Sequence, residues 1–363
     1  MVLFRPFFWG AILFGCALGV AYGATFELGI NFHIGQQAIS ASKVIDFVSF
    51  ANIKNGRDEI YWSRIEIDKG KFINPPEMAE LKRLATYFRS NGGRLVVVLG
   101  YGNSIYESKS HPRSDEAIDA YSAYCEYVAS RFRGLGVVFE IWNEWNSEIG
   151  VPLGRGKGSP EDYIRLISKA GPAIRRGAPD ALIISTGIAR GVEDIDWLRS
   201  FAKLNGGKYI DGVGIHTYIF NKPSWTIARL VKLLQDISSE TTPLGELARS
   251  KGFYITEYGL PFQKDDATKS SKLVEAILNL STLEVVRGIW LYQLIDPSRG
   301  GGDEANFGLF NAEAQSKAGL YFRTRVFGLI NQCGRPSRIN DGFFVFSKGG
   351  CEVHPQNVSL PGY

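Results

Sequence analysis

The segment RLVVVLGYGN occupies residues 94–103, and it is continuously apolar from Leu95 to Leu99. A second segment, Leu182–Ile184, is apolar in the same way. Strands of a parallel sheet have this composition when helices cover both faces of the sheet, because no side chain then points into water. The two segments therefore predict buried parallel strands.

Short apolar segments of this kind alternate with helical patterns along the chain. The eight strand candidates cover residues 27–35, 51–58, 94–103, 136–146, 181–189, 210–220, 252–261 and 288–296. Helix candidates lie between them at residues 40–50, 76–90, 114–132, 160–176, 225–250 and 267–286. Ser114 and Ser159 have the residue type and position of helix N-caps, and Pro160 suits a first helical turn. Strands separated by helices predict parallel β-α-β units, and eight such units predict a (β/α)₈ TIM barrel.

A doubly wound open sheet is the alternative fold. That fold usually carries a glycine-rich phosphate loop after its first strand. Here the first strand candidate runs into Asn31-Phe32-His33-Ile34-Gly35-Gln36, which has no GxGxxG pattern. We therefore expect the barrel to span residues 25–330. Residues 331–363 form a short C-terminal extension, in which Phe343–Phe346 and residues 351–353 flank a turn at 347–350 and predict a β-hairpin packed on the barrel.

Residues 1–24 have the composition of a cleavable secretory signal peptide. They contain one positive charge, Arg5, then an apolar run over residues 9–22, and then Gly23 and Ala24. The run is short for a membrane span, so we expect a secreted or periplasmic protein with no stable span after cleavage. Two alternatives remain open, a lipoprotein cleavage box ending at Cys16 and an uncleaved N-terminal anchor.

The chain has four cysteines, and none of them forms a CxxC pair, which argues against a zinc or iron–sulfur site. An oxidising compartment would permit a disulfide between Cys333 and Cys351. Cys125 lies in an apolar helical stretch and is expected to be a buried, inert thiol. We expect no metal and no other cofactor.

The formal charge of +4 is small for 363 residues, and the longest basic cluster is the pair Arg175 and Arg176. Nucleic-acid binding would need a basic stripe or patch. We therefore expect no nucleic-acid partner.

Two glutamates stand at the ends of apolar strand candidates. The fourth candidate ends in Trp142-Asn143-Glu144 and the seventh in Thr256-Glu257. Barrel enzymes carry their reactive groups at the C-terminal strand ends, and strands four and seven lie roughly opposite each other. Two facing acids suit glycoside hydrolysis, in which one protonates the leaving oxygen and the other attacks the anomeric carbon or activates water. A structural ion pair with an arginine is the alternative for each glutamate.

Glu140 and Glu148 compete with Glu144 for the role of strand-end acid. Glu140 lies four residues inside the strand candidate, and Glu148 lies beyond it in a glycine-containing loop. Neither follows an asparagine, so Glu144 is preferred.

These motifs resemble glycoside hydrolase clan A. Asn143-Glu144 after an apolar strand resembles the asparagine–glutamate signature of the clan, and Thr256-Glu257 resembles its nucleophile strand. Residues 57–72 resemble the second-strand region of family 39. The resemblance covers residues 27–322 and implies a retaining mechanism, with Glu144 as acid/base and Glu257 as nucleophile. The two carboxylates should then stand about 5 Å apart.

The resemblance also implies that Asn143 binds the sugar 2-hydroxyl and that Tyr218 donates a hydrogen bond to Glu257. His216 lies two residues before Tyr218 and therefore points to the same face of its strand. Arg57, at the end of the second strand candidate, would hold Glu257 ionised by charge pairing, or would form an ordinary ion pair at the barrel rim.

Three further strand-end residues are candidates for contact with a sugar. His33 ends the first strand candidate, although a lone histidine is more often structural. Trp290 and Tyr292 on the eighth candidate would form a sugar platform, with core packing as the equal alternative. The loops at residues 103–112, 147–160 and 297–311 should shape the cleft.

Together these features predict a retaining, endo-acting glycoside hydrolase with an extracellular polysaccharide as its substrate. A carbohydrate-binding barrel without activity is one alternative. A transglycosylase is another, because it would use the same residues and differ only in whether water or a sugar accepts the intermediate.

Overall fold

The computed structural model describes residues 26–37, 39–190, 194–218, 226–261, 267–298, 301–313, 315, 326–340, 343–346 and 352–353. The N-terminal segment that resembles a signal peptide lies outside these residues. Among the described residues, no helix is both long enough and apolar enough to cross a membrane.

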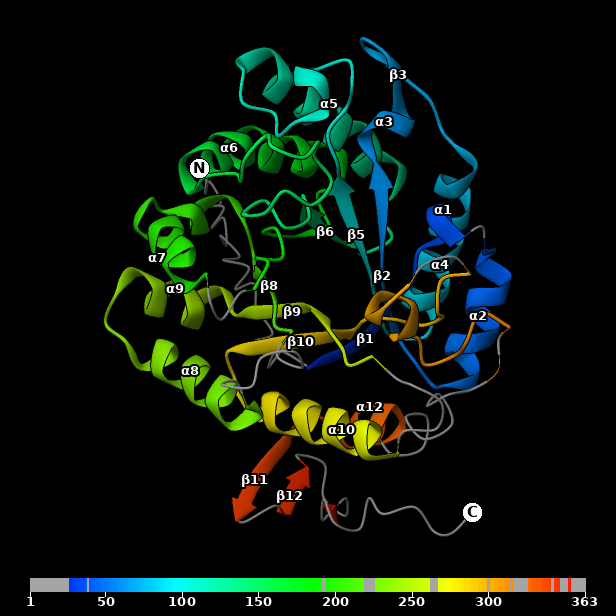
Figure 1. Ribbon diagram of the computed structural model, residues 1–363, viewed down its shortest axis with the longest axis vertical. Coiled ribbons are helices and arrows are strands. Elements are labelled where there is room, and N and C mark those ends of the chain that lie inside the picture. The colour runs from blue at the N-terminus through cyan, green and yellow to red at the C-terminus, as the bar shows by residue number, and fades with distance from the viewer. Residues whose placement is uncertain are drawn as a thin grey trace, which may run out of the picture.

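Eight parallel strands form the central sheet, and helices surround it (Figure 1). The strand order is β7-β6-β5-β2-β1-β10-β9-β8. Two isolated parallel bridges, Ile184 with Gly212 and Ile188 with Ile215, bring the edge of β7 to β8 and nearly close the sheet. The predicted (β/α)₈ barrel is therefore confirmed. Its strands are β1 (Glu27–Asn31), β2 (Asn55–Tyr61), β5 (Leu95–Gly100), β6 (Val138–Ile141), β7 (Leu182–Ile184), β8 (Val213–His216), β9 (Phe253–Tyr258) and β10 (Val286–Leu291).

The helices between these strands begin where their capping residues allow. The Ser114 side chain accepts a hydrogen bond from the third residue of α5, and Ser159 does the same for α6. The main helices are α2 (Ala41–Phe50), α4 (Pro76–Ser90), α5 (Asp115–Arg131), α6 (Pro160–Gly177), α7 (Ile195–Lys203), α8 (Ile227–Ser239), α9 (Pro243–Lys251) and α10 (Ala267–Ser281). Short elements that the sequence did not suggest are α1 (Ile34–Gln37), α3 (Trp62–Ile65) and the hairpin of β3 (Glu66–Asp68) and β4 (Lys71–Phe72).

The single helix predicted over residues 225–250 is wrong, because the structure divides it into α8 and α9. Thr242 caps the second helix by accepting a hydrogen bond from the Gly245 N–H, and Pro243 occupies its first turn. Proline has no N–H to donate inside a helix, so a new helix starts there.

Strand β2 extends further than predicted. The sequence suggested an end near Asp58, but the strand continues through Glu59 to Tyr61. Arg57 is therefore the third residue of the strand, not its last, and is only 2% exposed. Its guanidinium lies inside the barrel, below the rim.

An apolar layer fills the lower part of the barrel interior. It is formed by Val96, Val138, Ile184, Tyr254 and Trp290. The Trp290 indole is fully buried and donates a hydrogen bond from Nε1 to the Gly56 carbonyl at 3.2 Å. A Cβ atom at Gly29 would lie 2.4 Å from this indole, so a glycine is needed there. The suggestion that Trp290 forms a sugar platform is therefore wrong, and the alternative of core packing is correct.

The C-terminal part adds a small antiparallel sheet beside α10 (Figure 1). Strand β12 (Phe343–Phe346) pairs with β13 (Glu352–Val353), which confirms the expected hairpin, and β11 (Pro336–Asn340) pairs with the other edge of β12. The Arg335 guanidinium donates hydrogen bonds to the carbonyls of Ser281 and Val286. These bonds tie the start of the small sheet to the barrel.

The helix α12 (Gly328–Cys333) ends at a disulfide-bonded cysteine, Cys333. Cys351, its expected partner, lies outside the described residues, so this pairing stays a prediction. Cys125 is a free, buried thiol.

Candidate active site

Glu144 is presented at the mouth of the barrel by a tight turn after β6. Trp142 and Glu144 both have positive φ angles, 69° and 53°, which side-chain-bearing residues rarely adopt. The turn is held because the indoles of Trp142 and Trp145 are fully buried and because the Glu144 N–H donates to the Gly187 carbonyl at 3.1 Å. Backbone strain of this kind is common at functional sites, where the surrounding structure maintains it.

Glu257 lies on β9, and its carboxylate receives two hydrogen bonds. Arg57 Nη1 donates to Oε1 at 2.8 Å, and the Tyr218 hydroxyl donates to Oε2 at 2.9 Å. Burial alone would raise the pKa of Glu257. The positive charges of His216 and Arg57, together with the Tyr218 hydroxyl, outweigh burial and hold this pKa below its usual value. Glu257 is therefore ionised at neutral pH.

The imidazole of His216 stands between the two glutamates. Its Nδ1 lies 2.7 Å from Glu144 Oε1 and 3.5 Å from Glu257 Oε2, and its ring is fully buried. Burial opposes protonation, but the charge of Glu257 and the hydrogen bond and charge of Glu144 raise the pKa of His216 above its usual value. One carboxylate oxygen of each glutamate and a ring nitrogen of His216 all lie within 4.8 Å of one another.

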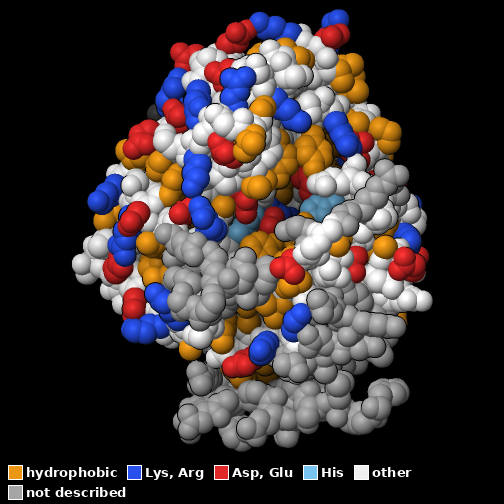
Figure 2. Space-filling view, in the orientation of Figure 1, with side chains coloured by type: hydrophobic (Ala, Val, Ile, Leu, Met, Phe, Trp, Pro, Cys, Tyr) orange, Lys and Arg blue, Asp and Glu red, His pale blue; other side chains and the backbone are white. Residues whose placement is uncertain are grey.

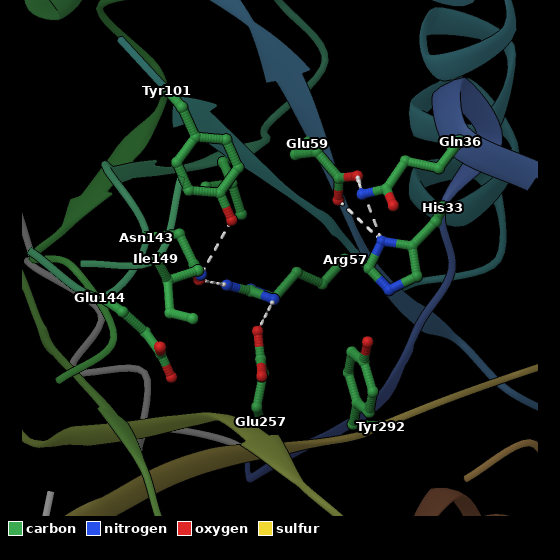
Figure 3. A pocket seen from close by; sticks show the side chains of 11 residues that line it. His33, Gln36, Arg57, Glu59, Tyr101, Asn143, Glu144, Ile149, Glu257 and Tyr292 are labelled. Carbon is green, nitrogen blue, oxygen red and sulfur yellow. Dashed lines mark hydrogen bonds and ion pairs between the residues drawn. The ribbon is translucent and has the colours of Figure 1, made fainter. Parts of the chain in front are cut away.

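Arg57 connects the acids to the floor of the site. It donates from Nη2 to Asn143 Oδ1 at 2.8 Å and from Nη1 to Asn31 Oδ1 at 2.7 Å. The Asn143 side chain in turn donates to the Tyr101 hydroxyl at 3.0 Å. The guanidinium also contacts Glu140, as described below. Figure 3 shows Arg57 at the centre of this network.

A second polar cluster lies across the cavity from Glu144. His33 Nδ1 is 2.9 Å from Glu59 Oε2, and Gln36 Nε2 and the Tyr61 hydroxyl donate to Glu59 Oε1 (Figure 3 shows the first three residues). Burial opposes charge on both members of the pair. Their mutual attraction outweighs it, so the pKa of His33 is raised to about 9 and that of Glu59 is lowered to about 2.

A cavity of about 190 Å³ joins the two groups. Figure 2 shows it as a hollow near the centre of one face, with acidic and histidine side chains exposed inside. Tyr292, which stands just after β10, forms part of its wall, and its ring meets that of His33 with centroids 5.5 Å apart. The lining residues are His33, Gln36, Arg57, Glu59, Val98, Tyr101, Asn143, Glu144, Ile149, Glu257 and Tyr292.

The structure thus brings together nearly all residues selected from the sequence. Those in or beside the cavity are Glu144, Glu257, Asn143, Arg57, His216, Tyr218, His33 and Tyr292. Trp290 lies instead in the barrel interior. Sequence reasoning missed Gln36, Glu59 and Tyr101. Glu59 could have been found, because it is two residues after Arg57 on one strand and so faces the same way.

Two groups of side chains could each offer three ligands to a metal ion. They are Glu144, His216 and Glu257, and His33, Asp58 and Glu59. In both groups the histidine Nδ1 lies at hydrogen-bonding distance from a carboxylate. Arg57 already supplies a positive charge to Glu257. The contacts are therefore explained as hydrogen-bonded networks without an ion.

A parallel barrel with Glu144 just after its fourth strand and Glu257 on its seventh has the fold and the acid pair expected of a glycoside hydrolase. The family model described as Cellulase (glycosyl hydrolase family 5) matches residues 21–282. The chain therefore belongs to glycosyl hydrolase family 5, and the expected membership of clan A is confirmed. The resemblance of residues 57–72 to family 39 is a finer assignment within clan A, and the family model places the chain in family 5. No curated protein matches the chain in sequence.

Solved structures share the fold at low sequence identity. A family 39 glycoside hydrolase from Bacteroides cellulosilyticus WH2 has a TM-score of 0.70 and 18% identity, over 91% of this chain and 69% of that one. GH5_18 from Streptomyces cattleya, in complex with GlcNAc, has a TM-score of 0.65 and 17% identity, over 88% and 83% of the two chains. Xylanase 10B from Thermotoga petrophila RKU-1, in complex with xylobiose, has a TM-score of 0.60 and 15% identity, over 84% and 94%.

Proposed function

We propose that this glycoside hydrolase cleaves a polysaccharide with retention of anomeric configuration. The observation that carries the proposal is the separation of Glu144 and Glu257, whose nearest carboxylate oxygens lie within 4.8 Å. Retaining enzymes need carboxyl groups about 5 Å apart, so that one can attack the sugar directly. Inverting enzymes leave about 6.5–9.5 Å for a water molecule between the acid and base.

Glu257 is the nucleophile in this mechanism. Its lowered pKa keeps it ionised, and Arg57 and Tyr218 hold its oxygens in place. It attacks the anomeric carbon and forms a glycosyl ester, while Glu144, which must be protonated for this step, gives its proton to the departing glycosidic oxygen. Glu144 then takes a proton from water, and the resulting hydroxide attacks the anomeric carbon and releases Glu257.

The remaining cavity residues bind and orient the sugar. Asn143 is held by Arg57 and Tyr101 beside the acid pair, in a position to contact a ring hydroxyl. His33 and Tyr292 lie across the cavity from Glu144 (Figure 3). Since Glu144 protonates the leaving group, the sugar that becomes attached to Glu257 extends away from Glu144 and toward these two residues.

We further propose that the substrate is an extracellular polysaccharide and that the enzyme cuts within the chain. The signal-like composition of residues 1–24 supports export. The match to a cellulase family supports a polymeric substrate. Sugar complexes among the structural relatives, with GlcNAc and with xylobiose, support a carbohydrate in this cavity.

A polysaccharide panel tests the proposal. Purified protein is incubated with xylan, glucans, mannan and bacterial exopolysaccharides, and the products are sized, with Glu144→Gln as the control. We expect internal cleavage by the wild type and almost none by the variant. Monomer release from the start would contradict internal cleavage, and binding without cleavage would indicate a carbohydrate-binding protein. Products longer than the substrate would indicate a transglycosylase.

Proton NMR during hydrolysis tests the stereochemistry. We expect the first product to have the anomeric configuration of the cleaved bond, and Glu257→Gln to abolish turnover. An inverted first product, or an active Glu257→Gln variant, would overturn the assignment.

A further inference from the structure

Glu140 is a fully buried carboxylate beneath the proposed catalytic pair. It lies on β6, four residues before Glu144, and its side chain is 0% exposed. An ionised carboxylate in this position must be compensated by donors and positive charge, because burial without them is costly. Four donors surround it, and each comes from a residue close to one of the two catalytic glutamates.

Two of the donors belong to Arg57. Arg57 Nε donates to Glu140 Oε2 at 2.7 Å, and Nη2 donates to Oε1 at 3.3 Å. The guanidinium is planar and rigid, so these two bonds also fix the direction of Nη1. Nη1 is the atom that donates to Glu257 Oε1 at 2.8 Å. The orientation of the donor to Glu257 therefore depends on Glu140.

The other two donors connect Glu140 to the backbone around the catalytic pair. The Gly187 N–H donates to Glu140 Oε1 at 2.8 Å, while the Gly187 carbonyl accepts from the Glu144 N–H. The Thr256 hydroxyl donates to the same oxygen at 3.3 Å, and Thr256 is the residue before Glu257. Glu140 is thus bonded to the immediate neighbours of both glutamates.

The charges give Glu140 a second effect. Arg57 forms ion pairs with both Glu140 and Glu257, at 2.7 and 2.8 Å. Without Glu140, the whole positive charge would act on Glu257 and would make it a weaker base and nucleophile. The negative charge of Glu140 offsets part of this effect, so Glu257 is a stronger base and nucleophile than it would be beside Arg57 alone.

We propose that Glu140 is a positioning residue for the reaction, which orients Arg57 toward Glu257 and shares its positive charge. The inference rests on the proposed function in one respect, since it takes Glu257 as the nucleophile. Its effect on the ionisation of Glu257 is independent of any substrate.

The variant Glu140→Gln tests this by removing the charge with little change of shape. Glu66→Gln is a matched control, because Glu66 is also buried and accepts three hydrogen bonds, from Trp62, Gly70 and Tyr106. None of these donors contacts the catalytic pair. Glu140→Asp keeps the charge but shortens the side chain, so it separates charge from orientation.

The first readout is the titration of Glu257. It is measured by ¹³C NMR with labelled glutamate carboxyl carbons, and the Glu257 signal is identified as the one that is missing in Glu257→Gln. We expect Glu257 to titrate at lower pH in Glu140→Gln than in the wild type. In Glu66→Gln it should titrate at the wild-type pH, and in Glu140→Asp close to the wild-type pH. An unchanged titration in Glu140→Gln would overturn the sharing of charge. If Glu140→Gln does not fold, Glu140→Asp gives the answer. This variant keeps the negative charge, so a Glu257 that titrates well below the wild-type pH would also overturn the sharing of charge.

The second readout is turnover of 4-nitrophenyl β-cellobioside and β-xyloside and of the best polysaccharide in the panel. We expect kcat to fall about tenfold to hundredfold in Glu140→Gln and in Glu140→Asp, with a smaller change in KM. Wild-type kcat in Glu140→Asp would overturn the orienting role. If the wild type turns over none of these substrates, the proposed function fails, while the NMR titration still decides the role of Glu140.

Discussion

His216 occupies the space that a side chain at Gly187 would need. A Cβ atom at position 187 would lie 2.0 Å from Nε2 of His216, closer than any real contact. The imidazole is fully buried and holds Glu144 through Nδ1, so it has no free direction in which to move. Position 187 must therefore be a glycine if His216 is to keep its place beside Glu144.

Gly187→Ala should displace His216 and with it Glu144. We expect at least about a tenfold loss of kcat/KM, the size of effect produced when a supporting residue moves a catalytic group. Hydrolysis kinetics of the variant give the answer. Thr86→Ala is the control, because the Thr86 hydroxyl is exposed on α4 and bonds the Lys82 carbonyl. Wild-type kinetics in Gly187→Ala would show that the histidine can relax.

Tyr218→Phe should weaken the hold on Glu257. The hydroxyl donates to Oε2 at 2.9 Å, and a hydrogen bond to a charged group contributes about 1.5–3 kcal/mol. We expect kcat/KM to fall about tenfold to hundredfold. We also expect its acid limb to move to higher pH, since the pKa of Glu257 loses a lowering contribution. Tyr127→Phe, which loses only a hydroxyl bonded to Asn74, should leave both unchanged.

His111 should make the protein less stable in acid. It is buried against the rings of Trp142 and Trp145, with centroids 5.3 and 4.5 Å away, and burial and the charge of Arg113 lower its pKa to about 4. Unfolding restores a pKa of about 6.5. The neutral histidine therefore gives full stability above about pH 6.5, and protonation removes it as the pH falls toward 4. The loss is up to about 3 kcal/mol.

Denaturant unfolding over this pH range measures the effect of His111. In His111→Phe, the part of the acid dependence that comes from this residue should disappear. An identical pH dependence in the variant and the wild type would refute the assignment.

The pair of His33 and Glu59 should act in the opposite direction. The pKa of His33 is about 9 in the folded protein and about 6.5 when unfolded. The protonated ring therefore contributes stability that is full below about pH 6.5 and is lost as the pH rises through 9. In Glu59→Gln, NMR titration should place the pKa of His33 well below 9. A value that stays near 9 would mean that Asp58 or Glu257, the other acids acting on His33, hold the proton.

Cys333 should be joined to Cys351 in the oxidised protein. Peptide mapping without reductant tests this pairing, and a peptide linking Cys333 to Cys16 or Cys125 would contradict it. The two cysteines are 18 positions apart, so the cross-link should stabilise the protein by about 3 kcal/mol. Unfolding in the presence and absence of reductant measures that contribution, with Cys333→Ser as the control for side effects of the reductant.

Much of the fold was predictable because the strands and helices have local sequence signals. Apolar runs such as Leu95–Leu99 and caps such as Ser114 depend only on neighbouring residues. The end of β2 was misjudged for a physical reason. Asp58 and Glu59 look like the start of a loop, yet the strand continues because His33, Gln36 and Tyr61 provide partners for Glu59.

The site was predictable where function and strand ends coincide, as at Glu144 and Glu257. Gln36 and Tyr101 could not be found, since they reach the cavity from a short helix and a loop whose courses depend on tertiary packing. The direction of the Trp290 side chain was equally undetermined. Only the space left by Gly29, on a neighbouring strand, shows that the indole lies inside the barrel.

The apolar layer around Trp290 has a consequence for the order of events in catalysis. It fills the barrel interior below the cavity, so a substrate reaches Glu144 and Glu257 from the mouth of the barrel. In the proposed mechanism, the departing sugar chain and the incoming water therefore both pass through this mouth. In the proposed mechanism, the molecule that reaches the glycosyl-enzyme next, water or a second sugar, determines whether the substrate chain is shortened or extended.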